Sequence, residues 1–393
     1  MTPTTAARLE PEATTGRPTS GQLGRYFLKL GAAGFGGPIA LAGAMQRDLV
    51  EQRRWFSTQD YAQGLALAQL APGPLAAQLA IYLGWVHSGL AGATLVAAAF
   101  ILPSFLMVLA IAAGYVHYGG LPWMQGMFYG IGASVIAMVA RSAFKLMRTT
   151  LGADRALWAI FLLNALATVW TEREVVWMVV ASGVALFLLR GGWRSAPVAA
   201  LVPPAWLVQG LQGAASWPTL LRLVLYFGQA GVLVFGSGLA IVPFLRGGVV
   251  DRFHWLSDRQ FLDAMAVAMI TPGPVVITVA FIGFLVAGLG GAIAAAIGVF
   301  LPCYGFVVLL APRYRRIAGN RSVQAFVAGV TAAACGAIAG AAVILGRRAI
   351  VDLPTAFLAF VTLIVLIRFR RIPEPVLILA AGAAGLAWKL VGR

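Results

Sequence analysis

The chain has 393 residues, of which 60% are hydrophobic and 11% are charged, and its formal net charge is +16. Soluble domains carry about a quarter of their residues as charged side chains. The composition therefore excludes a soluble globular fold and predicts an all-α polytopic membrane protein. The Lys and Arg residues gather in short clusters between apolar stretches, as the positive-inside rule requires, so the positive charge does not indicate a nucleic-acid partner.

Residues 1–20 are rich in Thr, Pro and Ala and lack the apolar core of a signal peptide. They predict a disordered tail on the cytoplasmic side. From residue 21 onward, apolar stretches recur along the chain, for example at 95–113, 157–169 and 292–311. These stretches are longer than barrel strands and lack their alternation, so they predict transmembrane helices.

Two parts of the chain match each other when they are aligned about 200 residues apart. Tyr26-Phe27 aligns with Tyr226-Phe227, and Pro72-Gly73-Pro74 aligns with Pro272-Gly273-Pro274. A one-residue gap then pairs Gly84 with Gly283 and Pro103 with Pro302. The match predicts homologous transmembrane repeats at 21–190 and 219–393, joined by a linker at 191–218 that could add one crossing.

The positively charged loops alternate in opposite phase in the two repeats. The first-half loop at 115–122 has no Lys or Arg, whereas its counterpart carries Arg313, Arg315 and Arg316. Because cytoplasmic loops hold the excess of positive charge, this pattern favours repeats of inverted topology. Each repeat has room for about six transmembrane segments of roughly 20 residues.

Each repeat contains a helix that is expected to break inside the protein. Ser57 and Ser257 begin capping-box patterns, so new helices are predicted from about residues 58 and 258. About fourteen residues later each helix reaches Pro-Gly-Pro, where the prolines disfavour helix. Each resulting piece is too short to cross the bilayer alone. We therefore expect Pro-Gly-Pro-broken half-helices, with a purely structural proline kink as the alternative.

Irregular backbone at membrane depth is tolerated where it is buried in protein or lines a polar cavity. Matching interruptions in two repeats indicate a transport site, and the free N–H groups of a half-helix suit an anion. Gly36-Gly37-Pro38 adds a second predicted break, although close helix packing also explains such glycines. The candidate substrate-binding residues are Lys29, Phe35, Gly36, Gly37, Pro38, Pro72, Gly73, Pro74, Gln78, Phe235, Gly236, Ser237, Gly238, Thr271, Pro272, Gly273, Pro274 and Thr278. Lys29 would neutralise an anion, or would instead extend to the lipid headgroups.

The ionisable residues argue against other chemistries. Nearly all 13 acidic residues fall in tails, loops or helix ends, and Asp263 is the deepest of them. A cation transporter usually needs buried carboxylates. The three His residues are scattered and form no metal-ligand or catalytic cluster. We therefore expect no metal, cofactor or catalytic residue, and an intramembrane enzyme is the weakest alternative.

Several motifs together resemble the chromate ion transporter family. They are Phe35-Gly-Gly-Pro38, Arg-Asp-Leu-Val-Glu-Gln-Arg-Arg-Trp at 47–55, Leu-Ala-Pro-Gly-Pro at 70–74, Gln78-Leu-Ala, Phe235-Gly-Ser-Gly238, Trp255-Leu-Ser and Thr-Pro-Gly-Pro at 271–274. The resemblance covers 21–393 and corresponds to the long-chain, two-domain form. One departure is Ser237, which stands where the family often has a third glycine.

The resemblance implies a multi-pass protein of the bacterial plasma membrane that exports chromate and so confers resistance. It also implies energy from the membrane potential or a proton gradient. Sulfate or another tetrahedral oxyanion is the alternative substrate, because chromate and sulfate share charge and shape and a pocket separates them poorly. The expected partners are a small inorganic anion and membrane lipid, with a homodimer left open.

Overall fold

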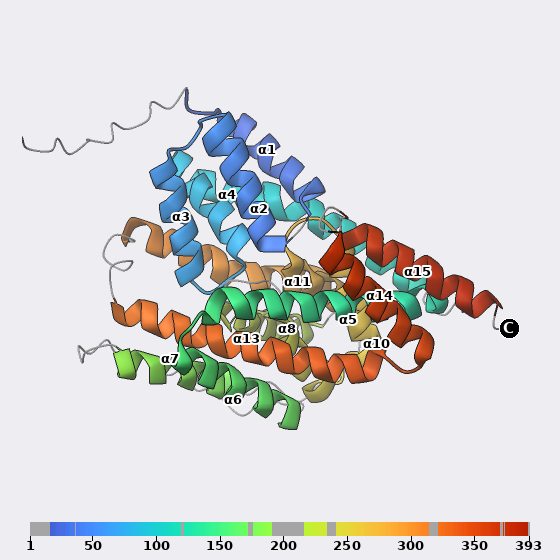
Figure 1. Ribbon diagram of the computed structural model, residues 1–393. Helices are drawn as coiled ribbons and strands as arrows, with labels where there is room; N and C mark the ends of the chain where they lie inside the picture. Colours follow the sequence, from blue (N-terminus) through green and yellow to red (C-terminus); the bar gives the residue numbers. More distant parts are fainter. Residues whose placement is uncertain are drawn as a thin grey trace, which may run out of the picture.

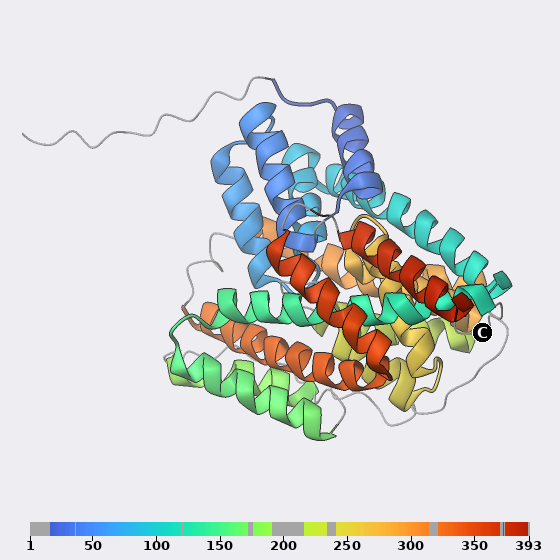
Figure 2. The same cartoon turned by 45° about the vertical axis from the view of Figure 1, so that its right-hand side comes forward.

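The computed structural model describes residues 16–35, 37–118, 122–171, 176–190, 216–233, 241–313, 321–369, 372 and 374–391. The described residues form helices and their connections, with no strand among them (Figures 1 and 2). The first-half elements are α1 (Ser20–Ala33), α2 (Gly37–Met45), the π-helix η1 (Gln46–Gln52), α3 (Thr58–Leu70), α4 (Leu75–Tyr118), α5 (Pro122–Leu151), α6 (Arg155–Thr171) and α7 (Val176–Arg190). The second-half elements are α8 (Trp217–Leu233), α9 (Ile241–Arg246), η4 (Gly247–Arg252), α10 (Asp258–Ile270), η5 (Val275–Ile277), α11 (Thr278–Leu310), η6 (Ala311–Arg313), α13 (Arg321–Ala349), α14 (Leu353–Arg368) and α15 (Glu374–Val391).

The predicted helix starts near residues 58 and 258 are confirmed. The Ser57 hydroxyl accepts a hydrogen bond from the Asp60 N–H at 3.0 Å and donates to the Asp60 carboxylate at 2.7 Å. Ser257 and Gln260 form both bonds of a capping box. These side chains satisfy N–H groups that have no partner within the first turn, so each helix begins directly after its serine.

Residues 58–87 fold into a helical hairpin, with the first Pro-Gly-Pro at its tip. The Tyr82 hydroxyl donates to the Gln63 side chain at 3.4 Å across the two arms. In the second half the Thr278 hydroxyl donates to the carbonyl of Ala264 at 2.9 Å, which likewise joins both arms. We call residues 72–74 the first tip and residues 272–274 the second tip. Each arm of α3 or α10 has 13 residues, about 20 Å, too short to cross a bilayer core of about 30 Å.

The chain reverses again inside α4 and α11. Gly89 and Gly288 have φ of 61° and 60°, the left-handed region that favours glycine. A Cβ at Gly84 would collide with the carbonyl of Gly92, although these residues would lie about 12 Å apart along one straight helix. Gly283 and Gly291 repeat the same contact. The part of α4 after Gly89, and the part of α11 after Gly288, therefore run back along the helices that precede them.

The two repeats exchange their last helices. In the first half α5 packs against α14 and α15, while in the second half α13 packs against α6 and α7 (Figures 1 and 2). The α5–α15 contact is so close that a Cβ at Gly130 would overlap the carbonyl of Ala381. The corresponding Gly329 would meet the carbonyl of Ser182 at 2.6 Å. Small residues thus let the backbones approach, as they do in membrane bundles, and the repeats share one interleaved core.

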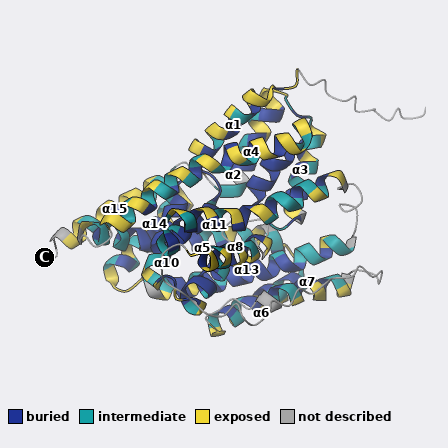
Figure 3. Ribbon diagram, turned by 180° about the vertical axis from the view of Figure 1, so that it is seen from behind, coloured by how far each residue is buried: buried dark blue, intermediate teal, exposed yellow. Residues whose placement is uncertain are grey.

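Four helical stretches of the described chain are long and apolar enough to cross a membrane: Leu75–Tyr118, Trp123–Arg148, Val275–Leu310 and Ser322–Arg347. Exposed apolar side chains line the outer faces of the two central helices, and yellow ribbon marks such positions in Figure 3. They include Leu95, Leu102 and Leu106 on α4, and Ile293, Ile297 and Leu301 on α11. Apolar side chains repeated at this spacing form a stripe that faces lipid.

Some predictions fall beyond these residues or stay open. The linker at 191–215 and the tail at 1–15 lie outside the described residues. Three expectations stay predictions: the opposite insertion of the two repeats, six crossings per repeat and an extra crossing in the linker. The break expected after α1 is present, because α1 ends at Ala33 and α2 begins at Gly37, which has φ of 77°.

Candidate functional site

The second tip is bonded to the first repeat. The Gly273 N–H donates to the carbonyl of Gly34 at 2.8 Å, just after the end of α1. The Ser104 hydroxyl on α4 donates to the carbonyl of Gly31 at 3.1 Å. Gly273 has φ of 96°, and a Cβ placed on it would collide with the Ser104 Oγ. Only glycine fits here without a shift, because the tip touches both the end of α1 and the middle of α4.

The first tip has a matching neighbour in the second repeat. Gly73 has φ of 137°, and a Cβ on it would lie 2.6 Å from the Gln78 Nε2 and 3.1 Å from the Cys303 Sγ. Cys303 follows Pro302 on α11 just as Ser104 follows Pro103 on α4. Each tip therefore contacts the equivalent residue on the long helix of the opposite repeat. The contacts are reciprocal: the first tip contacts α11, the second tip contacts α4, and these two helices pack against each other.

Gln78 is the polar side chain that the first tip holds in the core. It is fully buried, and its Nε2 donates to the carbonyl of Pro72 at 2.6 Å. Its Oε1 has no hydrogen-bond partner. An amide has two N–H donors and an acceptor oxygen, so Gln78 has hydrogen-bonding capacity that the bond to Pro72 does not use. A buried polar atom without a partner is costly, so the unpaired Oε1 distinguishes Gln78 from the other buried side chains at the tip.

The two candidate threonines, Thr271 and Thr278, use their hydroxyl protons within the second hairpin. Thr271 and Thr278 are both buried beside the second tip, as expected. The Thr271 hydroxyl donates to the carbonyl of Val267 at 2.9 Å, and the Thr278 hydroxyl donates to Ala264. A hydroxyl has a single proton to donate. Each threonine therefore uses its hydroxyl proton to hold the hairpin together, and that proton is not available to an oxyanion.

Lys29 is not brought to the tips, whereas Phe35 directly follows Gly34, the acceptor of the Gly273 N–H. Lys29 is exposed, and Phe35 is 42% exposed. Successive residues of a helix are about 100° apart, so Lys29 lies nearly opposite Gly31. Because Gly31 faces α4 and accepts the Ser104 hydroxyl, Lys29 must face away from α4. The reading in which this lysine extends from the surface fits its position better than the reading in which it neutralises an anion.

The other candidates divide into those at the tips and those that cannot be placed. Pro72 is half-buried and Pro74, Pro272 and Pro274 are buried, all within the two tips. Gly37 and Pro38 are half-buried at the start of α2. Gly36 and the second-half motif Phe235, Gly236, Ser237 and Gly238 lie outside the described residues.

The sequence prediction missed Ser104, Cys303 and Gly34. Ser104 and Cys303 are both fully buried and each follows a proline that pairs across the repeats. That pairing was the available signal, but nothing in one sequence says that a tip of one repeat will pack against the long helix of the other. Within the described residues no group of three or more His, Cys, Asp or Glu side chains could hold a metal.

Comparisons with known proteins agree with this architecture of two repeats. The model of the chromate transporter family matches residues 21–187 and 221–386. A chromate transport protein of Cupriavidus metallidurans is 55% identical over 380 residues, covering 93% of this chain and 92% of the relative. A probable chromate transport protein of Synechococcus elongatus is 52% identical over 381 residues, covering 93% and 94%.

A chromate transport protein of Pseudomonas aeruginosa is more distant, at 31% identity over 388 residues, which cover 93% of this chain and 91% of the relative. No solved structure matches the chain. The duplicated family match, the similarity along nearly the whole chain and the long apolar helices lead to one conclusion. The chain belongs to the chromate transporter family and is a multi-pass membrane protein.

Proposed function

We propose that the protein exports chromate across the bacterial plasma membrane, and so confers chromate resistance, by alternating access at the two hairpin tips. The observation that carries the proposal is the reciprocal contact of each tip with the opposite repeat, at Ser104 for the second tip and Cys303 for the first. The names of the relatives supply the substrate. An inorganic dianion would be recognised by backbone N–H groups at the start of α4 and by the Gln78 amide.

The close packing at the tips sets a condition on the mechanism. A Cβ fits beside neither Gly73 nor Gly273 without a shift of neighbouring atoms, so an anion enters only when a hairpin moves. The bond from Gly273 to Gly34 fixes the second tip on α1. Breaking and re-forming that contact would open the site to one side of the membrane and then the other, as in transporters built from paired repeats.

The test is uptake of radiolabelled chromate and sulfate into energised inverted membrane vesicles, in which uptake corresponds to export from the cell. We expect chromate to accumulate above the level of vesicles without the protein. Competition by sulfate would place the protein among general oxyanion transporters, and preferential uptake of sulfate would replace chromate as the substrate. If folded protein accumulates neither anion, the proposed function is wrong.

A further inference from the structure

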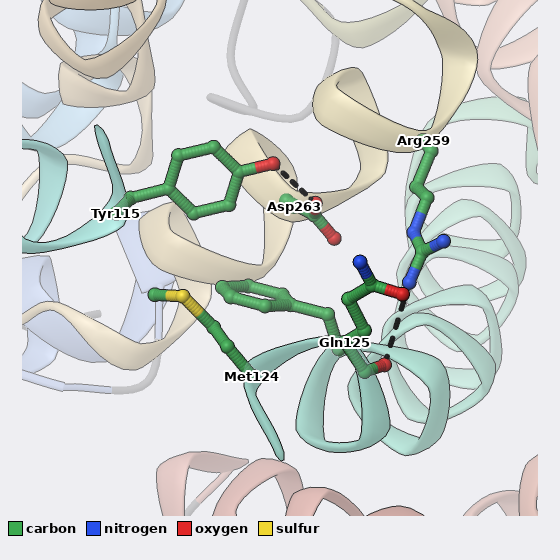
Figure 4. A pocket seen from close by; sticks show the side chains of 6 residues that line it. Tyr115, Met124, Gln125, Arg259 and Asp263 are labelled. Carbon is green, nitrogen blue, oxygen red and sulfur yellow. Dashed lines mark hydrogen bonds between the residues drawn. The ribbon is translucent and has the colours of Figure 1, made fainter. Parts of the chain in front are cut away.

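A cavity of about 150 Å³ lies between the repeats, away from the tips (Figure 4). Its walls come from α4 and α5 of the first half and α10 of the second. The lining residues are Tyr115, Met124, Gln125, Phe128, Arg259 and Asp263. Asp263 is the acidic residue among these six, so the cavity places a carboxylate at the boundary between the two repeats.

Asp263 is held by one neutral partner. Its side chain is 5% exposed, and its Oδ2 accepts the hydroxyl of Tyr115 at 2.8 Å (Figure 4). No Lys or Arg of the described chain lies within ion-pair distance of it. The Arg259 guanidinium instead donates to the carbonyl of Gln125 at 3.4 Å. A buried ionised carboxylate without an ion pair costs free energy, and a buried acid of this kind in a multi-pass transporter points to a functional role.

The acid occurs in one repeat only. At an offset of 200 residues, Asp263 corresponds to Gln63 and Arg259 to Gln59. Gln63 accepts the hydroxyl of Tyr82 at 3.4 Å, so the first repeat keeps a tyrosine-to-side-chain bond near this position. An amide can make that bond without gaining or losing a proton. The Gln63 bond lies within one hairpin, whereas the Asp263 bond joins the two repeats, and the carboxyl of the second repeat adds the capacity to titrate.

Asp263 is also connected to the second tip. It lies in α10, the arm that leads to the tip, beside Ala264, whose carbonyl holds the other arm through Thr278. Its partner Tyr115 is on α4, the helix that carries Ser104 at the tip. The Tyr115–Asp263 bond and the Ser104–Gly273 contact therefore join the same hairpin to the same helix, about 16 Å apart along α4.

We propose that Asp263 is the proton-binding site that couples substrate movement to a proton gradient, an inference that rests on the proposed transport function. A proton from cavity water adds to the carboxylate and makes a neutral carboxylic acid, and the reverse step returns it. The hydrogen bond from Tyr115 is strongest when its acceptor is charged. Protonation weakens that bond and frees the α10 hairpin to leave α4.

Tyr115 on α4 and Arg259 on α10 are the titratable or charged groups of the described chain that act on this carboxyl, and the α5 wall contributes only Met124, Gln125 and Phe128.

The experiment compares two modes of transport in proteoliposomes that contain the full chain. Exchange of labelled for unlabelled chromate needs no net proton movement, whereas accumulation under an imposed pH gradient, with the membrane potential clamped at zero, does. We expect Asp263→Asn to exchange chromate within about twofold of the wild type but to lose gradient-driven accumulation about tenfold or more, the scale of a lost coupling free energy. Asp263→Glu should retain accumulation, and the matched control Gln63→Asn should keep both modes.

Each other outcome overturns the inference. Gradient-driven accumulation by Asp263→Asn would show that the carboxyl carries no coupling proton. Loss of exchange together with accumulation, in folded protein, would assign it to substrate binding or to structure. A wild type that exchanges chromate but ignores pH gradients of both signs would remove proton coupling and leave the proposed function standing. A wild type that does not exchange chromate would remove both.

Tyr115→Phe provides an independent readout, because loss of its hydroxyl should shift the pH profile of accumulation without abolishing exchange.

Discussion

The two tips share a sequence but are held in different ways. The first tip is held from within its own hairpin, because the Gln78 side chain donates to the carbonyl of Pro72 at 2.6 Å. The second tip is held from outside, because the Gly273 N–H donates to Gly34 of the other repeat at 2.8 Å. Thr278, which lies four residues after the second tip as Gln78 does after the first, bonds to the hairpin arm instead of the tip.

Under the proposed function, this difference separates substrate recognition at the first tip from anchoring at the second. In the proposed mechanism the first tip recognises the anion through the second N–H of the Gln78 amide, since one Nε2–H already bonds Pro72 and the unpaired Oε1 is an acceptor. Beside the second tip, the hydroxyls of Thr271 and Thr278 both donate to carbonyls of their own hairpin. The contacts of the second tip with α1 and α4 make it the part of the site whose movement must be controlled. The two copies of one hairpin thus differ in the side chains that hold their tips, and the proposed mechanism gives recognition to the first tip and anchoring to the second.

The largest effect is expected from Gly273→Ala. The added Cβ would collide with the Ser104 Oγ at a positive φ, which costs about 1–3 kcal/mol as overpacking. The added Cβ disfavours the conformation in which the tip contacts α4, and since about 1.4 kcal/mol shifts such an equilibrium tenfold, we expect chromate uptake per folded protein to fall about tenfold or more. Uptake into inverted vesicles, normalised to the monodisperse protein peak, measures the change.

The matched variants are Gly73→Ala and the double variant Gly273→Ala with Ser104→Ala. At Gly73 the nearest atom is the end of the flexible Gln78 side chain, so the first tip should tolerate the methyl group better. Removing the Ser104 hydroxyl should restore part of the uptake that Gly273→Ala loses. Equal losses at both tips, with no rescue, would mean that the two tips are held alike.

A smaller effect, on thermal stability, is expected from Arg246→Gln, at the point where α9 and η4 lead into α10. Arg246 is buried and forms ion pairs with Asp251 at 3.1 Å and Asp258 at 3.0 Å, whereas the corresponding Gln46 is exposed. Arg246→Gln leaves two carboxylates without their cation, and because both are partly exposed we expect a loss of about 1–3 kcal/mol. Thermal unfolding in detergent, followed by fluorescence-detected gel filtration, should show a lower midpoint, and Gln46→Ala should leave the midpoint unchanged. An unchanged midpoint for Arg246→Gln would mean that the ion pairs do not stabilise this half.

The smallest effects sharpen the distinction between the tips. Gln78→Leu and Thr278→Val each remove one buried hydrogen bond, worth about 1 kcal/mol. We expect similar losses of thermal stability from both. Only Gln78→Leu should weaken the apparent affinity for chromate, since the Thr278 hydroxyl is already committed to Ala264. Equal changes in affinity would contradict the assignment of recognition to the first tip.

Much of this architecture could be predicted from local sequence. The serine caps placed the starts of α3 and α10, because a capping side chain acts within one turn of its own helix. The interruption at each Pro-Gly-Pro follows from the missing donor and restricted backbone of proline. The direction of Lys29 was left open by the sequence, since it depends on which face of α1 packs, and Gly31 decides that face only through Ser104, which is 73 residues away.

By itself the sequence determined that the chain is helical and apolar, that it is duplicated, and where each hairpin begins and breaks. These properties depend on composition, spacing and short-range hydrogen bonds. Only the tertiary structure decided that the repeats exchange their last helices, that each tip contacts the opposite repeat, and that Tyr115 meets Asp263 across 148 residues. Such contacts depend on which surfaces pack most closely after the helices have formed, and no local pattern specifies that choice.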